Sequence, residues 1–155
     1  MRLMKPVLFV ILLALSVAVP AQASEVRLAL TGVGRFAVFA DISSIRPDGD
    51  GVRMRAFQVV EDSFAVDGTG YWGGWSWWRF DCAAHTADRL DFAAVRTGGE
   101  AGPAVADAPG PYDASPRGDA AELLAMACSP ETAATAVEVG SLAEAVSLGR
   151  ARLAD

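Results

Sequence analysis

The chain has 155 residues, with 13 lysine and arginine residues against 19 aspartate and glutamate residues and a net charge of −6 at neutral pH. This length fits a single domain, and the negative charge argues against nucleic acid or anionic lipid as a partner. His85 is the only histidine, which excludes a histidine-based metal site, and we expect it at the surface.

The first 23 residues have the pattern of a signal peptide. Arg2 and Lys5 precede an apolar run at 7–19, and "AQA" supplies small residues for cleavage after Ala23. The run is too short to span a bilayer comfortably, and no cysteine lies near the cleavage site to accept a lipid. Cleavage would leave 11 arginines against 19 acidic residues. We therefore expect a periplasmic or secreted protein with no stable membrane insertion after cleavage.

Alternation of apolar and polar residues with a period of two predicts strands after residue 25. The residues that share a face are Val26, Leu28 and Leu30 in the first strand, Phe36, Val38 and Ala40 in the second, and Val52, Met54 and Ala56 in the third. Turn residues occupy 47–51, and 61–70 is expected to be a connector. The fourth and fifth strands are expected at 71–82 and 86–97.

The segment "GVGRFA", residues 32–37, matches the G-x-G-x-x-A pattern of dinucleotide-binding sites. That site requires a helix after the glycines, whereas "RFAVFAD" alternates as a strand does. We therefore expect a hairpin turn at Gly32 and Gly34, and no cofactor.

The second half of the chain predicts a loop followed by helices. Residues 98–117 are rich in Gly, Pro, Ala and Asp and predict a long surface loop. Ser115 and Pro116 suit the start of a helix. The apolar residues with helical spacing are Ala120, Leu123, Leu124, Ala127 and Cys128. The Ala-rich tail at 131–155, with a capping box at Ser141 and Glu144, is expected to be helical or loosely ordered.

Cys82 and Cys128 are the two cysteines of the chain. Export would place them where disulfides persist, so we favour a structural disulfide, with two free thiols as the alternative. A bridge closing a loop of this size would stabilise the domain by roughly 4 kcal/mol in the chain-entropy model.

The stretch "YWGGWSWWRFDC", 71–82, contains all four tryptophans. As a strand it places Trp78, Phe80 and Cys82 on a core face. The candidate interaction surface on the other face consists of Tyr71, Trp75, Trp77 and Arg79. Gly73 and Gly74 mark a bulge or bend, so the sequence does not decide on which face the residues before Trp75 lie. The alternative for these rings is that the Ala-rich tail covers them.

From 26 to 128 the chain resembles the surface-adhesin protein E-like family. The resemblance rests on "DISSI", on an aromatic run ending in "FDC", and on a closing "AELLAMAC" helix. The matching positions are Asp41, Ser44, Ile45, Gly51, Asp81, Cys82, Arg89, Leu123 and Cys128. The resemblance implies an α+β fold over 24–130, in which a small antiparallel sheet of about five to six strands carries a C-terminal helix. It also implies that the Cys82–Cys128 disulfide tethers this helix to one face of the sheet.

Two functions remain open. The favoured one is a non-catalytic bacterial cell-envelope protein that binds an unknown protein or envelope polymer through the sheet or the 98–117 loop, with a homodimer left open. The alternative is a periplasmic domain that binds a sugar or peptide, or a hydrolase that uses a carboxylate pair. Asp41, Asp81 and Asp91 could meet in space for such a pair, although their spacing gives no support.

Overall fold

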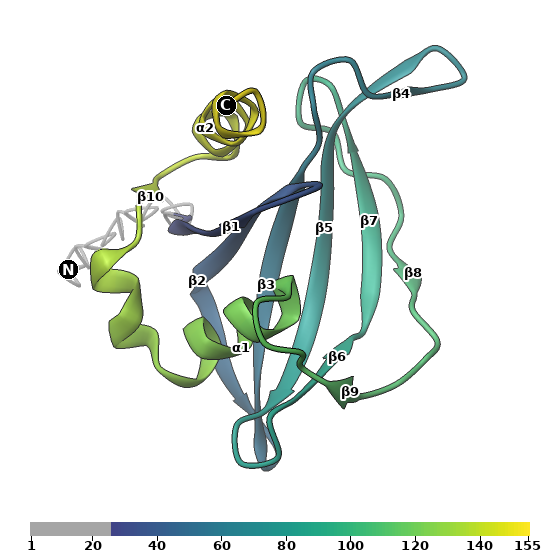
Figure 1. Ribbon diagram of the computed structural model, residues 1–155. Helices are drawn as coiled ribbons and strands as arrows, with labels where there is room; N and C mark the ends of the chain where they lie inside the picture. The colour runs from purple at the N-terminus through teal and green to yellow at the C-terminus, as the bar shows by residue number, and fades with distance from the viewer. Residues whose placement is uncertain (1–25) are drawn as a thin grey trace, which may run out of the picture.

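An antiparallel sheet of ten strands forms the centre of the computed structural model, which describes residues 26–155 (Figure 1). The expected signal peptide at 1–23 lies outside the described residues. The strands are β1 (Leu28–Val33), β2 (Ala37–Asp48), β3 (Gly51–Val59), β4 (Ala65–Val66), β5 (Thr69–Asp81), β6 (Thr86–Arg89), β7 (Asp91–Arg96), β8 (Val105–Ala106), β9 (Tyr112–Asp113) and β10 (Glu138–Val139). The helices are α1 (Asp119–Cys128), the 3-10 helix η1 (Pro130–Thr135) and α2 (Leu142–Leu153). The α+β class with an antiparallel sheet is confirmed.

The number of strands differs from the five to six expected from the sequence. Four of the ten strands, β4, β8, β9 and β10, have only two residues each, which is too short to leave a periodic pattern. They place part of the expected connector 61–70 and of the expected loop 98–117 in the sheet. The expected strand 86–97 is interrupted at Leu90, and its halves β6 and β7 both pair with β5.

The central strands bury side chains on both sides of the sheet. On one side, the α1 face, the buried residues include Ala40, Met54, Ala56, Trp78 and Phe80. On the other side, the α2 face, they include Phe39, Phe57, Val59 and Val95. Neighbouring residues of one strand alternate between these faces, as the pleat requires. Full burial of each large apolar side chain contributes about 1.5–3 kcal/mol.

Helix α1 packs on the α1 face through four of the five residues of the predicted stripe; Met126 is buried in addition, and Cys128 is half-buried. Its buried residues are Ala120, Leu123, Leu124, Met126 and Ala127. The helix begins at Asp119 rather than near Ser115 and Pro116. Arg117 has a left-handed φ of 67°, which interrupts the helical backbone, and Gly118 is the N-cap residue. The Gly118 N–H donates instead to the Ser115 carbonyl in a turn.

The disulfide between Cys82 and Cys128 is present, with 5.7 Å between the two Cα atoms. It joins the residue after β5 to the last residue of α1. The expected pairing and the tether between helix and sheet are therefore confirmed, and a disulfide is typical of proteins in oxidising compartments.

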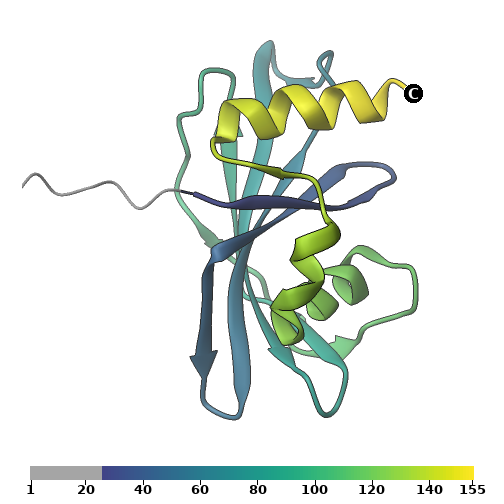
Figure 2. The same cartoon turned by 90° about the vertical axis from the view of Figure 1, so that its left-hand side faces the viewer.

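The Ala-rich tail forms a helix that docks on the sheet. Helix α2 crosses the upper end of the sheet, while α1 lies lower on one side (Figure 2). The Ser141 hydroxyl accepts from the Glu144 N–H, as a capping box requires, whereas the Glu144 carboxylate accepts from the Gly140 N–H rather than from that of Ser141. A Cβ at Gly149 would lie 2.9 Å from the Val59 Cβ, so glycine permits this close approach. Arg150 adds hydrogen bonds to the Val60 and Tyr71 carbonyls.

Among residues 26–155, the structure contains no helix with the length and apolar composition needed to cross a membrane.

Replacement of Cys128 by serine tests the tether. Under oxidising conditions the melting temperature should fall by roughly 10–20 °C, because the unfolded chain regains the entropy that the bridge removes. Differential scanning calorimetry gives the value, and wild type treated with reductant is the matched control. Equal melting of the variant and the oxidised wild type would contradict a stabilising bridge.

Candidate functional site

Strand β5 divides the tryptophan stretch between the two faces as the sequence predicts for residues 75–80. Trp78 and Phe80 lie on the α1 face, where they are 6% and 0% exposed. Trp75, Trp77 and Arg79 lie on the opposite face and are half-buried. Trp78 and Phe80 therefore belong to the core, whereas Trp75, Trp77 and Arg79 remain partly exposed.

Tyr71 does not share a face with Trp75 and Trp77. A register shift between Tyr71 and Gly73 changes the phase of β5, and Gly73 has a φ of +150°. A Cβ at Gly73 would overlap the Gln58 carbonyl oxygen, so only glycine fits this bulge. Tyr71 packs edge-on against Phe64, with 6.3 Å between the ring centroids. Trp72 takes its place on the α2 face.

Arginines gather around Trp75 and Trp77 on the α2 face. The guanidinium carbons of Arg46 and Arg53 lie 4.4 and 4.9 Å from the centroid of the Trp77 ring. That of Arg55 lies 3.9 Å from the Trp75 centroid. We define the arginine–tryptophan surface as these residues together with Arg79: Arg46, Arg53, Arg55, Trp75, Trp77 and Arg79. A cation over an indole ring is worth about 0.5–1 kcal/mol at an exposed site.

Three of these arginines form one row across the sheet. Arg46 of β2 is the register partner of Arg53 of β3, which is in turn the partner of Arg79 of β5. Like charges at directly opposed positions destabilise a sheet. Asp48 and Asp50 pair with Arg79, whereas Arg46 and Arg53 form no ion pair within residues 26–155. The Arg53 Nε atom is also buried without a hydrogen-bond partner in this part of the chain.

Asp41 fixes the position of Arg55 beside this row. Asp41 is 1% exposed, and its carboxylate accepts from the Ser43 hydroxyl and from two nitrogens of Arg55, the nearer at 2.7 Å. The Ser44 hydroxyl donates to the Asp41 carbonyl and accepts from the Arg55 N–H. Segment 41–45 is therefore a bulged part of β2 that holds Arg55 over Trp75.

Helix α2 covers part of the same face. Trp72 and Trp75 pack against the apolar cluster that includes Ala145 and Val146 of the helix, whereas Trp77 does not belong to that cluster. The tail is thus a cover for the upper rings, as the alternative from the sequence proposed, and it leaves Trp77 beside the arginine row.

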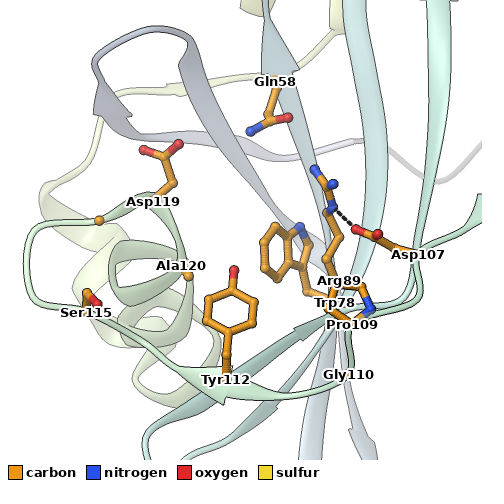
Figure 3. A pocket seen from close by; sticks show the side chains of 11 residues that line it. Gln58, Trp78, Arg89, Asp107, Pro109, Gly110, Tyr112, Ser115, Asp119 and Ala120 are labelled. Atoms are coloured by element: carbon orange, nitrogen blue, oxygen red, sulfur yellow. Dashed lines mark hydrogen bonds and ion pairs between the residues drawn. The ribbon is translucent and has the colours of Figure 1, made fainter.

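The α1 face contains a cavity of about 460 Å³ (Figure 3). Trp78, Gln58 and Arg89 project into it from the sheet, and Tyr112 and Asp119 face them from β9 and α1. Arg89 pairs with Asp107 at 2.5 Å. Burial raises the pKa of the Tyr112 hydroxyl above its ordinary value, and the Arg89 guanidinium partly opposes this rise.

A second cavity, of about 590 Å³, adjoins the first at Gln58, which lines both. Its walls are largely apolar and include Phe36, Phe64, Val66 and Phe92. A Cβ at Gly74 would overlap the Phe92 ring, so glycine lets this ring lie directly on β5. Neither cavity was expected, because their walls come from strands and loops far apart in the sequence.

The sequence-based candidates for catalysis are dispersed. Asp41 pairs with Arg55, the Asp81 carboxylate accepts from the Ala83 and Ala84 N–H groups, and Asp91 accepts from the Trp77 N–H. Strands β3 and β5 separate Asp41 from Asp91 in the sheet. His85 is exposed, as expected. The described residues contain no group of three or more His, Cys, Asp or Glu side chains suited to a metal.

Comparisons with protein-family models, with curated proteins and with solved structures find no match to this chain. The resemblance to the surface-adhesin protein E-like family stays a prediction.

Glu122 of α1 lies in a tight contact. Its carboxylate sits where a Cβ at Gly32 would be, so the absence of a side chain at Gly32 makes room for it. Burial, and to a smaller extent the nearby Asp119 carboxylate, raises the pKa of Glu122. The charged form of Glu122 is therefore disfavoured in the native state.

Replacement of Asp41 by asparagine should lower the free energy of unfolding by about 1–3 kcal/mol, because it removes the charge that Arg55 faces in a buried position. The matched control is Asp50→Asn, since the Asp50 side chain is 84% exposed and its loss should change stability by about 0.5 kcal/mol or less. Urea unfolding measures both values. Similar losses in the two variants would contradict the structural role of Asp41.

Glu122→Gln should raise the melting temperature at about pH 7.5 by roughly 1–3 °C. The pKa of Glu122 is higher in the native state than in the unfolded state, so its negative charge destabilises the native protein at pH values above the native pKa. This destabilisation disappears as the pH falls below the unfolded pKa, because the carboxyl is then neutral in both states. The gain should therefore vanish at about pH 3.5, where both states are protonated. Glu131→Gln, at an exposed position of η1, is the control, and a gain independent of pH would be the opposing result.

Proposed function

We propose that this protein is a non-catalytic cell-envelope protein that binds an anionic protein or envelope polymer through the arginine–tryptophan surface. The observation that carries the proposal is the row of arginines in which Arg46 and Arg53 have no ion pair among the described residues. Such a row costs stability in the free protein, and an anionic partner would offset this cost.

The chemistry of the surface favours carboxylate or phosphate groups. Guanidinium groups donate paired N–H bonds whose geometry matches these anions. Arg46 and Arg53, the two arginines of the row without an ion pair in residues 26–155, lie on adjacent strands that are about 4.8 Å apart, which suits a partner with closely spaced charges. The chain as a whole is acidic, and Asp41, Asp48 and Asp50 pair with Arg55 and Arg79. The positive charge that would orient an approaching partner is therefore that of Arg46 and Arg53.

The Trp77 ring lies at the centre of the arginine–tryptophan surface and contacts two of its arginines. It supports the guanidinium groups of Arg46 and Arg53, which restricts them before a partner arrives. Side chains that are ordered in advance lose less entropy on binding. A half-buried indole beside charged groups also offers an apolar contact, a combination that is enriched at protein interfaces.

The proposed location is the periplasm or the cell exterior. The disulfide supports it, since such bridges persist in oxidising compartments, and so does the signal-peptide pattern of residues 1–23. The family resemblance adds the expectation of a surface or envelope role, in keeping with a protein whose accessible feature is a binding surface.

Binding to poly-L-glutamate tests the proposal, because closely spaced carboxylates are the only charged groups along this polymer. The double variant Arg46→Gln, Arg53→Gln should weaken binding about tenfold or more, since each charge-assisted hydrogen bond is worth about 1.5–3 kcal/mol. The matched control is Arg96→Gln, Arg152→Gln, which removes two exposed arginines elsewhere and changes net charge equally. Isothermal titration calorimetry at low salt measures the dissociation constants.

If the control variant keeps its affinity for the polymer, binding depends on Arg46 and Arg53 in particular. An equal loss of affinity in both variants would show that only the net charge of the protein matters, and would contradict the proposal. Polygalacturonate in a second series distinguishes an acidic polysaccharide from an acidic polypeptide as the preferred partner. Binding that does not weaken as salt is raised would contradict an electrostatic interface.

A further inference from the structure

The two cavities on the α1 face adjoin at Gln58, and we refer to them together as the groove, with a polar end in the first cavity and an apolar end in the second. Gln58 lines both cavities, and the Arg89 guanidinium carbon lies 5.9 Å from the centroid of the Phe92 ring, between the two ends. The volumes, about 460 and 590 Å³, fall in the range of small-molecule sites. This groove is on the opposite side of the sheet from the arginine–tryptophan surface.

The polar end contains hydrogen-bonding groups with unused capacity. Trp78 is 6% exposed and lines the cavity, and a buried indole N–H usually has a partner. Within the described residues, no hydrogen bond involves the Trp78 indole, the Gln58 amide or the Tyr112 hydroxyl, although all three converge on the cavity (Figure 3). The indole N–H, the amide NH2 and the hydroxyl together offer four donor hydrogens, and the amide and hydroxyl oxygens are acceptors for one bound molecule.

The charges at the polar end select against an ionic ligand. Arg89 is the cation of this end, and Asp107 pairs with it at 2.5 Å. Asp119 faces the same space, so an anionic group would meet a carboxylate without gaining a free cation. A neutral head with hydroxyl or amide groups can instead use all the donors and acceptors.

The apolar end exposes side chains that a hydrocarbon group would cover. Phe64, which directly precedes β4, and Val66, in β4, are 41% and 49% exposed and line the second cavity. Phe36, from the β1–β2 turn, and Phe92, from β7, also line this cavity. Arg35 and Glu61 line it as well, and their opposite charges sum to zero. Burial of such surface contributes about 25 cal/mol per Å².

We propose that this groove is a binding site for a neutral amphiphilic small molecule, with the hydroxyl or amide head at Trp78, Gln58 and Tyr112 and the apolar tail between Phe64 and Phe92. The site is independent of the surface that binds anions. It uses residues of the opposite face of the sheet, and its ligand is neutral rather than anionic.

Titration with octyl glucoside below its critical micelle concentration tests the site, since this probe combines a hydroxyl-rich neutral head with an apolar tail. Isothermal titration calorimetry should show saturable binding to the wild type. Octyl sulfate and octyltrimethylammonium, which have the same tail and charged heads, should bind at least about threefold more weakly. Tighter binding of either charged probe, or no saturable binding of octyl glucoside, would overturn the proposal.

Two variants locate the probe within the groove. Tyr112→Phe removes one hydroxyl at the polar end, and Phe64→Ala removes one ring at the apolar end; both residues are partly exposed, so the fold should tolerate the changes. Each should weaken octyl glucoside binding about three- to tenfold. Val137→Ala, 48% exposed and outside the groove, and the Arg46→Gln, Arg53→Gln pair should leave it unchanged. Unchanged binding in both groove variants would overturn the proposal.

Discussion

The register of β3 against β5 decides which side chains reach each face of the sheet, and the rest of the structure depends on it. Eight consecutive pairs run from Val52 opposite Phe80 to Val59 opposite Gly73. A slip of one residue would exchange the two sets of side chains, placing Arg53 and Arg55 in the core and Met54 outside it. The disulfide at the end of β5 and the bulge at Gly73 enclose this paired segment on either side.

Burial on both faces explains why the sheet needs two helices and why each leaves part of its face open. Helix α1 covers Met54, Trp78 and Phe80, and α2 covers Phe39 and Phe57 on the other side. Each helix is short, with 10 residues in α1 and 12 in α2, so neither spans the full length of the central strands. The uncovered part of one face carries arginines around an indole, and that of the other forms a groove with apolar walls.

The sequence predicted those features that depend on local periodicity. Trp78, Phe80 and the stripe of α1 follow from periods of two and 3.6, and the disulfide follows from the presence of two cysteines in a chain with an export pattern. The phase of Tyr71 could not be predicted, because a bulge at Gly73 adds a residue to one strand only. The sequence shows that Arg53 and Arg55 share one face of their strand. It does not show that Arg46 and Arg79 lie beside Arg53, because that depends on how the strands pair. The net charge likewise gave no sign that arginines concentrate on one face.

The central claim is that the two faces of one sheet present separate binding sites, and the four tryptophans report on them directly. Their indole N–H signals in the nuclear magnetic resonance spectrum of the labelled protein can be followed during titration with poly-L-glutamate and with octyl glucoside. Trp77 lies at the arginine row, whereas Trp78 lies on the wall of the groove. The account predicts that the polymer shifts the Trp77 signal and the amphiphile shifts the Trp78 signal. A shift of the same indole signal by both ligands would contradict it.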